Sequence, residues 1–187
     1  FWVYKQVYNT DGNPIEGVYV DRNGDNQIND TDRYIYKDPY ADIIMGLNTS
    51  INYKFWDLTV VTRYNIGNYA YNNIVSAKCY SARVTENSIL TNLHRNALDT
   101  RFESLTETNL LSDYYIQEAS FFKIDNITLG YTFERALKEN PIRIFASAQN
   151  ILTITDYDGL DPEITGGIDN NFYPRPTSVT MGASINF

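Results

Sequence analysis

The sequence predicts an all-β protein: an antiparallel segment of a transmembrane β-barrel with long extracellular loops. Two observations lead to this prediction. Several segments alternate between apolar and polar residues, and the long polar connections between them all fall on one side of the predicted sheet. No apolar run approaches the ~18 residues of a membrane-spanning helix, which excludes a helical membrane protein. A barrel strand needs an apolar residue only at every second position, so a barrel stays possible.

The last ten residues, SVTMGASINF, alternate most strictly. Because successive side chains of a strand point to opposite faces, this tail predicts a strand with one apolar and one polar face. In a barrel the apolar face contacts lipid and the other face lines the interior. The apolar parity consists of Val179, Met181, Ala183, Ile185 and Phe187.

Four inner segments repeat this alternation and form two predicted hairpins. The first hairpin has a very short turn at 53–55, and the second has a short connection at 134–140. Residues 1–8 predict a sixth strand with a weaker pattern. Runs of roughly 10 residues match the ~9–11 that a tilted strand needs to cross the hydrocarbon. The four inner segments are 42–53, 55–66, 123–133 and 141–152.

Three long, polar, turn-rich connections separate the strands: 9–42, 67–118 and 152–175. Barrels carry long loops outside the cell and short turns in the periplasm. If the C-terminus is periplasmic, all three long connections are extracellular. A soluble β-sandwich would explain the alternation equally well, but not this asymmetry. Aromatic residues expected in a girdle at the periplasmic strand ends are Tyr53, Phe55, Trp56, Tyr131, Phe133 and Phe187.

The predicted strands do not make a complete barrel. Six strands cannot close around a ligand-sized interior, and open sheet edges are not tolerated in lipid, so this segment must complete a larger sheet. The sequence starts at Phe1 and shows no targeting signal. We therefore expect it to be a mature portion or a piece of a longer protein.

Composition narrows the function classes. The net charge of −8 argues against nucleic acid as a partner. We find no Ser/His/Asp set, no phosphate-binding glycine-rich loop and no Cys/His cluster, and we predict that the chain is not an enzyme. The single cysteine, Cys79, is interpreted as a buried small hydrophobe, and the single histidine, His94, as a solvated or packing residue in a short loop helix.

Tyrosine is frequent, with 16 residues. Its apolar ring and polar tip suit a membrane interface and also the recognition of sugars or proteins. An ordinary β-rich protein with tyrosines in its strands is the simpler alternative. The stretches DYDGLDP and NNFYPRP are candidates for contact with a ligand or a covering partner, although packing between loops is the preferred interpretation for any single tyrosine.

The stretch DRNGDNQINDTD has the spacing of a calcium-binding loop. Oxygen ligands at positions 1, 3, 5, 7, 9 and 12 wind a short loop around one ion. Asn26 takes the usual glycine position and tolerates the left-handed conformation. A turn rich in Asp and Asn that needs no ion is the alternative. The predicted ligands of a structural calcium ion are Asp21, Asn23, Asp25, Gln27 through its carbonyl, Asn29 and Asp32.

Several longer stretches resemble a known family. They are GVYVDRNGDNQINDTDRY, YKFWDLTV, GNYAYNN, SDYYIQEASFFKIDNITLGYTF, ASAQNILTITDYDGLDPEI and GIDNNFYPRPTSVTMGASINF. Together they resemble the C-terminal third or less of SusC/RagA-type TonB-dependent outer-membrane transporters of Bacteroidota. The resemblance covers 1–187 and implies the C-terminal part of a 22-stranded barrel domain. It implies about the last six strands and three external loops, with the plug domain outside this chain.

The resemblance also implies a function and partners. It implies import of an oligosaccharide or peptide across the outer membrane of a Gram-negative bacterium, with energy from the TonB–ExbB–ExbD complex through the N-terminal part and a SusD-like lipoprotein as a lid. The ending TMGASINF resembles the signal read by the barrel-assembly machinery. Two alternatives stay open: a plug-less porin or structural outer-membrane protein, and a secreted soluble β protein with a dockerin-like calcium loop that binds carbohydrate.

Overall fold

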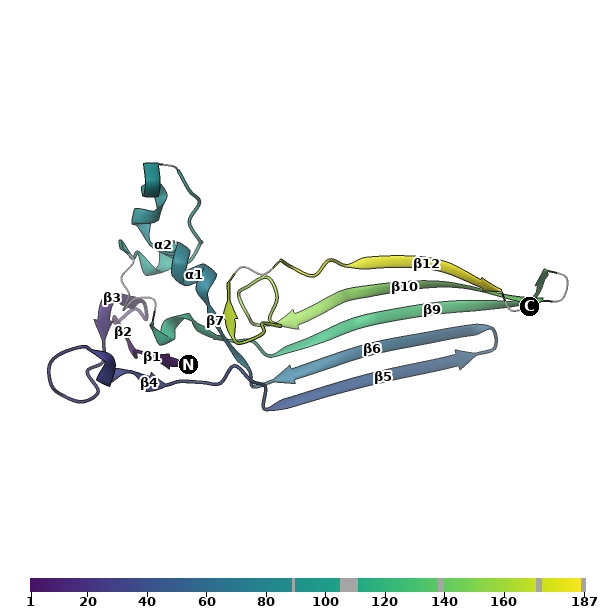
Figure 1. Cartoon of the computed structure of the whole chain (residues 1–187), viewed down its shortest axis with the longest axis horizontal. Coiled ribbons are helices and arrows are strands. Elements are labelled where there is room, and N and C mark those ends of the chain that lie inside the picture. Colours follow the sequence, from purple (N-terminus) through teal and green to yellow (C-terminus); the bar gives the residue numbers. More distant parts are fainter. Residues whose placement is uncertain (89, 105–110, 138–139, 171–172, 186–187) are drawn as a thin grey trace. The chain divides into compact units, whose positions relative to one another are not determined.

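The chain divides into two compact units in the computed structural model (Figure 1). The structure describes residues 1–88, 90–104, 111–137, 140–170 and 173–185. The sheet unit consists of Ala41–Gly67, Ser120–Asp156 and Tyr173–Phe187. The connection unit consists of Phe1–Tyr40, Asn68–Ala119 and Tyr157–Phe172.

The sheet unit is one antiparallel sheet of five strands in the order β12-β10-β9-β6-β5 (Figure 1). Each strand pairs with the sheet strand that precedes or follows it in sequence, which makes an up-and-down meander. The four predicted inner segments and the tail are therefore confirmed as strands. They are β5 (Ile43–Tyr53), β6 (Trp56–Ile66), β9 (Phe121–Leu137), β10 (Asn140–Thr155) and β12 (Ser178–Ile185).

The strand ends that lead into the long connections lie together at one end of the sheet. Ile43 of β5 pairs with Ile66 of β6, and Phe121 of β9 pairs with Thr155 of β10. At the opposite end, β5 and β6 are joined by the two-residue turn 54–55, in which Lys54 has a φ of +55°. Long and short connections thus leave opposite ends of the sheet, as the loop lengths predict.

One predicted strand and the bounds of one predicted connection are wrong. Residues 1–8 do not add a sixth strand to this sheet, because they form short strands within the connection unit. The predicted connection at 134–140 is shorter than expected, since β9 continues to Leu137 and β10 begins at Asn140. The residues between them, and the predicted girdle residue Phe187, lie outside the described residues.

The connection unit contains short strands and helices where the sequence suggested irregular loops. Its sheets pair β1 with β4, β2 with β3, and β11, β7 and β8 together. Its strands are β1 (Trp2–Val3), β2 (Gln6–Tyr8), β3 (Pro14–Tyr19), β4 (Tyr34–Ile35), β7 (Tyr69–Asn72), β8 (Ile116–Glu118) and β11 (Ile168–Asp169). Its helical segments are η1 (Asp30–Asp32), α1 (Asn73–Lys78), η2 (Ser81–Ser88), α2 (Ala97–Thr100) and η3 (Asp113–Tyr115).

This unit has its own core. One cluster surrounds Cys79, which is 1 % exposed and has its sulfur 3.3 Å from the Tyr115 hydroxyl, so the interpretation of Cys79 as a buried small hydrophobe is confirmed. A second cluster packs Tyr157 against Ala70 and Ala119. The members of the first cluster are Val75, Cys79, Tyr80, Phe102 and Tyr115.

The three long connections are joined to one another by hydrogen bonds. The Glu16 carboxylate accepts hydrogen bonds from the backbone N–H groups of Glu103 and Ser104. The Asn72 side-chain amide donates to the Asp158 carbonyl. Segments from all three connections therefore fold as one body, because each supplies polar partners that the others need.

Candidate functional site: the two faces of the sheet and the aspartate-rich loop

Strand register places the predicted apolar residues on one face of the sheet. One row across the five strands consists of Ile51, Leu58, Leu129, Ala146 and Met181. The next row consists of Tyr53, Trp56, Tyr131, Ile144 and Ala183. Five separate alternations thus agree in space, and we call this surface the apolar face.

The apolar face is open along the whole sheet unit. Met181 is 79 % exposed and Leu47 is 61 % exposed, and even Leu129 on the central strand is 44 % exposed. A soluble protein seldom exposes so large an apolar surface, since each Å² left in water forgoes roughly 25 cal/mol. The other large apolar side chains of this face that are exposed are Ile43, Met45, Ile51, Tyr53, Trp56, Tyr64, Ile66, Phe133, Ile144, Leu152, Ile154, Val179 and Ile185.

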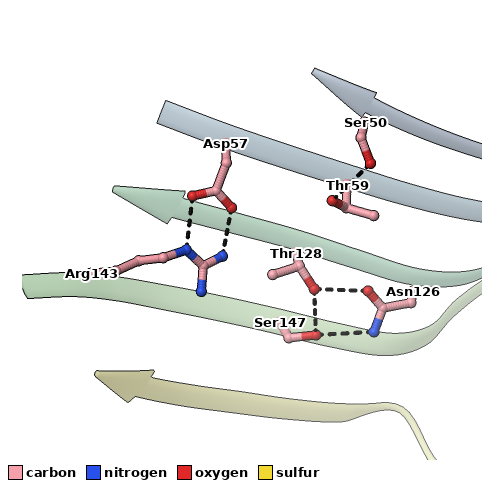
Figure 2. Close-up of polar contacts among 7 residues, drawn as sticks. All are labelled: Ser50, Asp57, Thr59, Asn126, Thr128, Arg143 and Ser147. Atoms are coloured by element: carbon pink, nitrogen blue, oxygen red, sulfur yellow. Dashed lines mark hydrogen bonds and ion pairs between the residues drawn. The ribbon is translucent and has the colours of Figure 1, made fainter. Parts of the chain in front are cut away.

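The opposite face carries hydroxyl and amide groups in register, and we call it the polar face. Figure 2 shows Thr128 bonded to Ser147 at 2.9 Å and to Asn126 at 2.9 Å, with the Asn126 amide donating to Ser147 at 3.0 Å. Ser50 and Thr59 lie 3.3 Å apart in the same row (Figure 2). These neutral groups satisfy one another and leave a surface that water or protein can solvate.

Two arginine–aspartate pairs lie on the polar face. Arg143 of β10 donates two hydrogen bonds to Asp57 of β6, at 2.9 and 2.5 Å, as Figure 2 shows. The pair passes over Gly130 of the intervening strand β9, where an added Cβ would collide with both side chains. Arg63 of β6 binds Asp125 of β9 in the same two-point manner. Bidentate geometry of this kind is the strongest form of such a pair.

A β-bulge at Asp125 explains why the alternation fades at the start of β9. Asn126 pairs with Val61 and Ile124 pairs with Thr62, so Asp125 is an extra residue in the ladder. Counting past it, Phe122 and Ile124 continue the apolar face. Lys123 lies on the polar face, where it is 1 % exposed with its ammonium group 5.1 Å from the centre of the Phe121 ring. Bulges re-aim side chains in this way.

Aromatic rings gather at the short-turn end of the sheet, as predicted. The Tyr131 ring lies 6.0 Å from Phe55, 4.8 Å from Trp56 and 4.7 Å from Phe133, with edge-on geometry in each case. Tyr53 pairs with Trp56 in the adjacent strand. The predicted girdle residues that the structure describes therefore lie together at this end of the sheet.

The aspartate-rich loop is wound around its own side chains. Asp21 accepts hydrogen bonds from the backbone N–H groups of Gly24, at 2.7 Å, and Asn26, at 2.8 Å. Asn26 has a φ of +60°, the left-handed conformation expected at the usual glycine position. Asp25 accepts from the Gln27 N–H at 2.8 Å. The loop thus forms the turn that is expected both of a calcium-binding loop and of an Asp- and Asn-rich turn without an ion.

The Asp32 side chain links the beginning and the end of this loop. It is fully buried and accepts hydrogen bonds from the N–H groups of Arg22 and Asn29, at 2.8 and 2.9 Å. The N–H groups of Asn29 and Arg22 hold the pKa of the Asp32 carboxyl below its usual range. Asn29 caps η1 reciprocally with Asp32. Predicted ligands at positions 1, 9 and 12 therefore also have structural roles.

The residue types of this loop fit a hard cation, since they offer carboxylate and amide oxygens. Within the part of the chain that the structure describes, no three His, Cys, Asp or Glu side chains converge as a metal site. Any ion would therefore need amide or carbonyl oxygens as well as carboxylates. The calcium assignment stays a prediction.

The tyrosines of the two candidate contact stretches differ in exposure. Tyr157 of DYDGLDP is buried and its hydroxyl donates to Asp169 at 2.7 Å, so it packs within the connection unit. Tyr173 of NNFYPRP is 91 % exposed. His94 lies just before α2 and not within a helix as predicted, and it accepts a hydrogen bond from the Asn96 N–H through Nδ1.

No helix in the described ranges is long and apolar enough to cross a membrane. No protein-family model matches the sequence.

The sequence is similar to curated TonB-dependent receptors. It is 40 % identical over 198 aligned positions to the TonB-dependent receptor SusC of Bacteroides thetaiotaomicron, covering 100 % of this chain and 19 % of the relative. It is 25 % identical over 194 positions to the TonB-dependent receptor P3 of Formosa agariphila, covering 95 % of this chain and 19 % of that protein. The chain thus spans about a fifth of the length of these relatives.

The fold is similar to solved RagAB structures. The RagAB peptide importer matches with TM-scores of 0.70 in its 'open-open' state and 0.71 in its 'closed-closed' state, at 20 % identity. Each match covers 100 % of this chain and 22 % or 23 % of the other chain. At this identity the likeness concerns the fold alone. The names of these relatives describe receptors and an importer rather than enzymes.

Proposed function

The chain belongs to the SusC/RagA family of TonB-dependent receptors, and on this basis we propose that it forms part of the wall and the extracellular loops of an outer-membrane nutrient importer. The observation that carries the proposal is the open sheet with one apolar and one polar face. Lipid would cover the apolar face, and the plug or water would contact the polar face. Strands upstream of this chain would pair with its open edges in a 22-stranded barrel.

The sidedness follows from the loop lengths. We assign the connections predicted at 9–42, 67–118 and 152–175, the last of which begins after β10 ends at Thr155, to the cell exterior and the turn at 54–55 to the periplasm. The clustered rings of Phe55, Trp56, Tyr131 and Phe133 suit the periplasmic interface, where aromatic side chains hold a barrel at the headgroup level.

The partners of the whole receptor are part of the same proposal. A SusD-like lipoprotein would cover the external loops, the cargo would be an oligosaccharide or a peptide, and the TonB–ExbB–ExbD complex would supply energy through the N-terminal part. Family membership supports these assignments, and exposed Tyr173 is a candidate contact for cargo or lipoprotein.

Accessibility from within the bilayer tests the proposed orientation. Single cysteines would be placed on β12 of the full-length receptor, in a background whose native cysteines, Cys79 included, are replaced by alanine, and labelled with a fluorophore in vesicles of brominated lipid. We expect quenching at Val179, Met181 and Ile185, and little at Thr180 and Ser184, because neighbouring residues face opposite ways. Equal quenching in both sets, or the reverse pattern, would refute the lipid-facing assignment and with it the importer.

We also propose that the aspartate-rich loop holds a structural calcium ion, with the six ligands predicted from its spacing. Replacing Asp21 and Asp25 by alanine should abolish calcium binding measured by calorimetry, because two of the charged ligands are lost. Asp11→Ala, in the same connection but outside the loop, should leave binding unchanged. Absence of calcium binding to the unaltered receptor would exclude the ion.

A further inference from the structure

Phe145 breaks the alternation of β10. It lies on the polar face between Arg143 and Ser147, where the pattern predicts a polar residue. Its cross-strand partners are Gly130 on β9 and Gly182 on β12. A large ring is therefore flanked on both sides by residues without side chains.

The Phe145 ring fills the space next to Gly182. A Cβ atom added at Gly182 would lie 2.6 Å from Cζ and 2.8 Å from Cε1 of Phe145, closer than real Cβ atoms approach other atoms. Gly182 does not have a positive φ, so its backbone conformation does not itself require glycine. The absence of a side chain at 182 is what admits the ring.

Arg143, which lies two residues before Phe145 on the same face of β10, contacts the Phe145 ring. Its guanidinium carbon lies 5.0 Å from the ring centre, and the guanidinium is bound at two points by Asp57. The ring is thus held against a side chain that is itself fixed by β6. A cation–π contact of this kind attracts the guanidinium group and the face of the ring to each other.

We propose that Phe145 and Gly182 form a register lock that holds the terminal strand β12 on β10. In the described part of the chain, β12 pairs only with β10. A slip of β12 by two residues would keep every apolar side chain on the apolar face, so alternation alone does not fix the register. Such a slip would place Thr180 or Ser184 opposite Phe145, where a side chain would meet the ring. This lock is independent of the proposed transport.

Disulfide trapping in the full-length receptor measures the register. In a background whose native cysteines, Cys79 included, are replaced by alanine, Ser147→Cys with Thr180→Cys reports the native register, since these residues pair directly. Ser147→Cys with Ser178→Cys reports the two-residue slip that places Thr180 opposite Phe145. Gly182→Ala should raise the ratio of slipped to native cross-link about fivefold or more, because overpacking disfavours the native register.

Two further variants decide the cause. Gly46→Ala is the matched control, because Gly46 also lies on the polar face but has open space around its Cα, and we expect no change in the ratio. In a Phe145→Ala background, Gly182→Ala should have no further effect, since the ring is gone. If Gly182→Ala matches Gly46→Ala, or raises the ratio equally with and without the ring, the lock is refuted.

Discussion

Met181→Arg in the full-length receptor should lower the free energy of unfolding from a lipid bilayer by roughly 2–4 kcal/mol if it lies near the midplane. Met181 is 79 % exposed on the apolar face and pairs with Ala146, in the row that crosses all five strands. An arginine there would leave its charge in hydrocarbon unless the side chain reached the interface. Ile185→Arg, nearer the strand end, should cost less.

Thr180→Arg is the control for this prediction, because Thr180 adjoins Met181 and points to the opposite face. We expect its effect to stay within about 0.5 kcal/mol. Denaturant unfolding of the receptor in vesicles, followed by tryptophan fluorescence, measures both free energies. Equal losses for the two variants would show that the faces of β12 do not differ in solvation.

The sheet was predictable because its signal is local. Residues two apart share a face, so the alternation of Val179, Met181 and Ile185 can be found without knowing any partner strand. The pattern failed where the backbone departs from that period. Asp125 is an extra residue in β9, and because of it Phe122 and Ile124 lie on the apolar face. Strict alternation counted back from Ile127 would place both residues on the polar face.

Pairing across strands was not predictable. Asp57, Arg63 and Arg143 fall on the polar parity of their segments, which the alternation does show. Which aspartate meets which arginine depends on register and on Gly130, which lets Asp57 reach across β9. Register is a property of two strands, and a single sequence pattern does not contain it.

The connection unit contains more regular structure than the sequence predicted, and the reason is different. Its long segments are polar and rich in turns, which usually indicates irregular loops. Their order comes from buried polar groups such as Gln6, which donates to the carbonyls of Ile15 and Val18 and accepts from Ser112. The bond between Ser112 and Gln6 joins residues 106 positions apart, and no short-range pattern reveals it. The turn of the aspartate-rich loop was predictable because Asp21, Asp25 and Asp32 accept backbone hydrogen bonds from within the loop itself.

Arg143→Met should lower the free energy of unfolding by about 1–3 kcal/mol, because it leaves Asp57 without its bidentate partner on a partly dehydrated face. The two side chains are 33 % and 27 % exposed, so water weakens the pair but does not replace it. Asp57→Leu should cost a similar amount. Lys54→Met, which removes a cation at the turn, is the control and should have little effect.

The double variant Asp57→Leu with Arg143→Met separates the free energy of the ion pair from the contributions of each residue's other contacts. If the ion pair carries the effect, the double variant should be less destabilised than the sum of the two single variants by about 1–2 kcal/mol, because no lone charge remains. Unfolding in vesicles measures the three free energies. Additive losses would mean that each residue acts through separate contacts, and β6 would then not be joined to β10 across Gly130. A coupled result would identify a bond between two strands that share no backbone ladder, which explains why the intervening residue must lack a side chain.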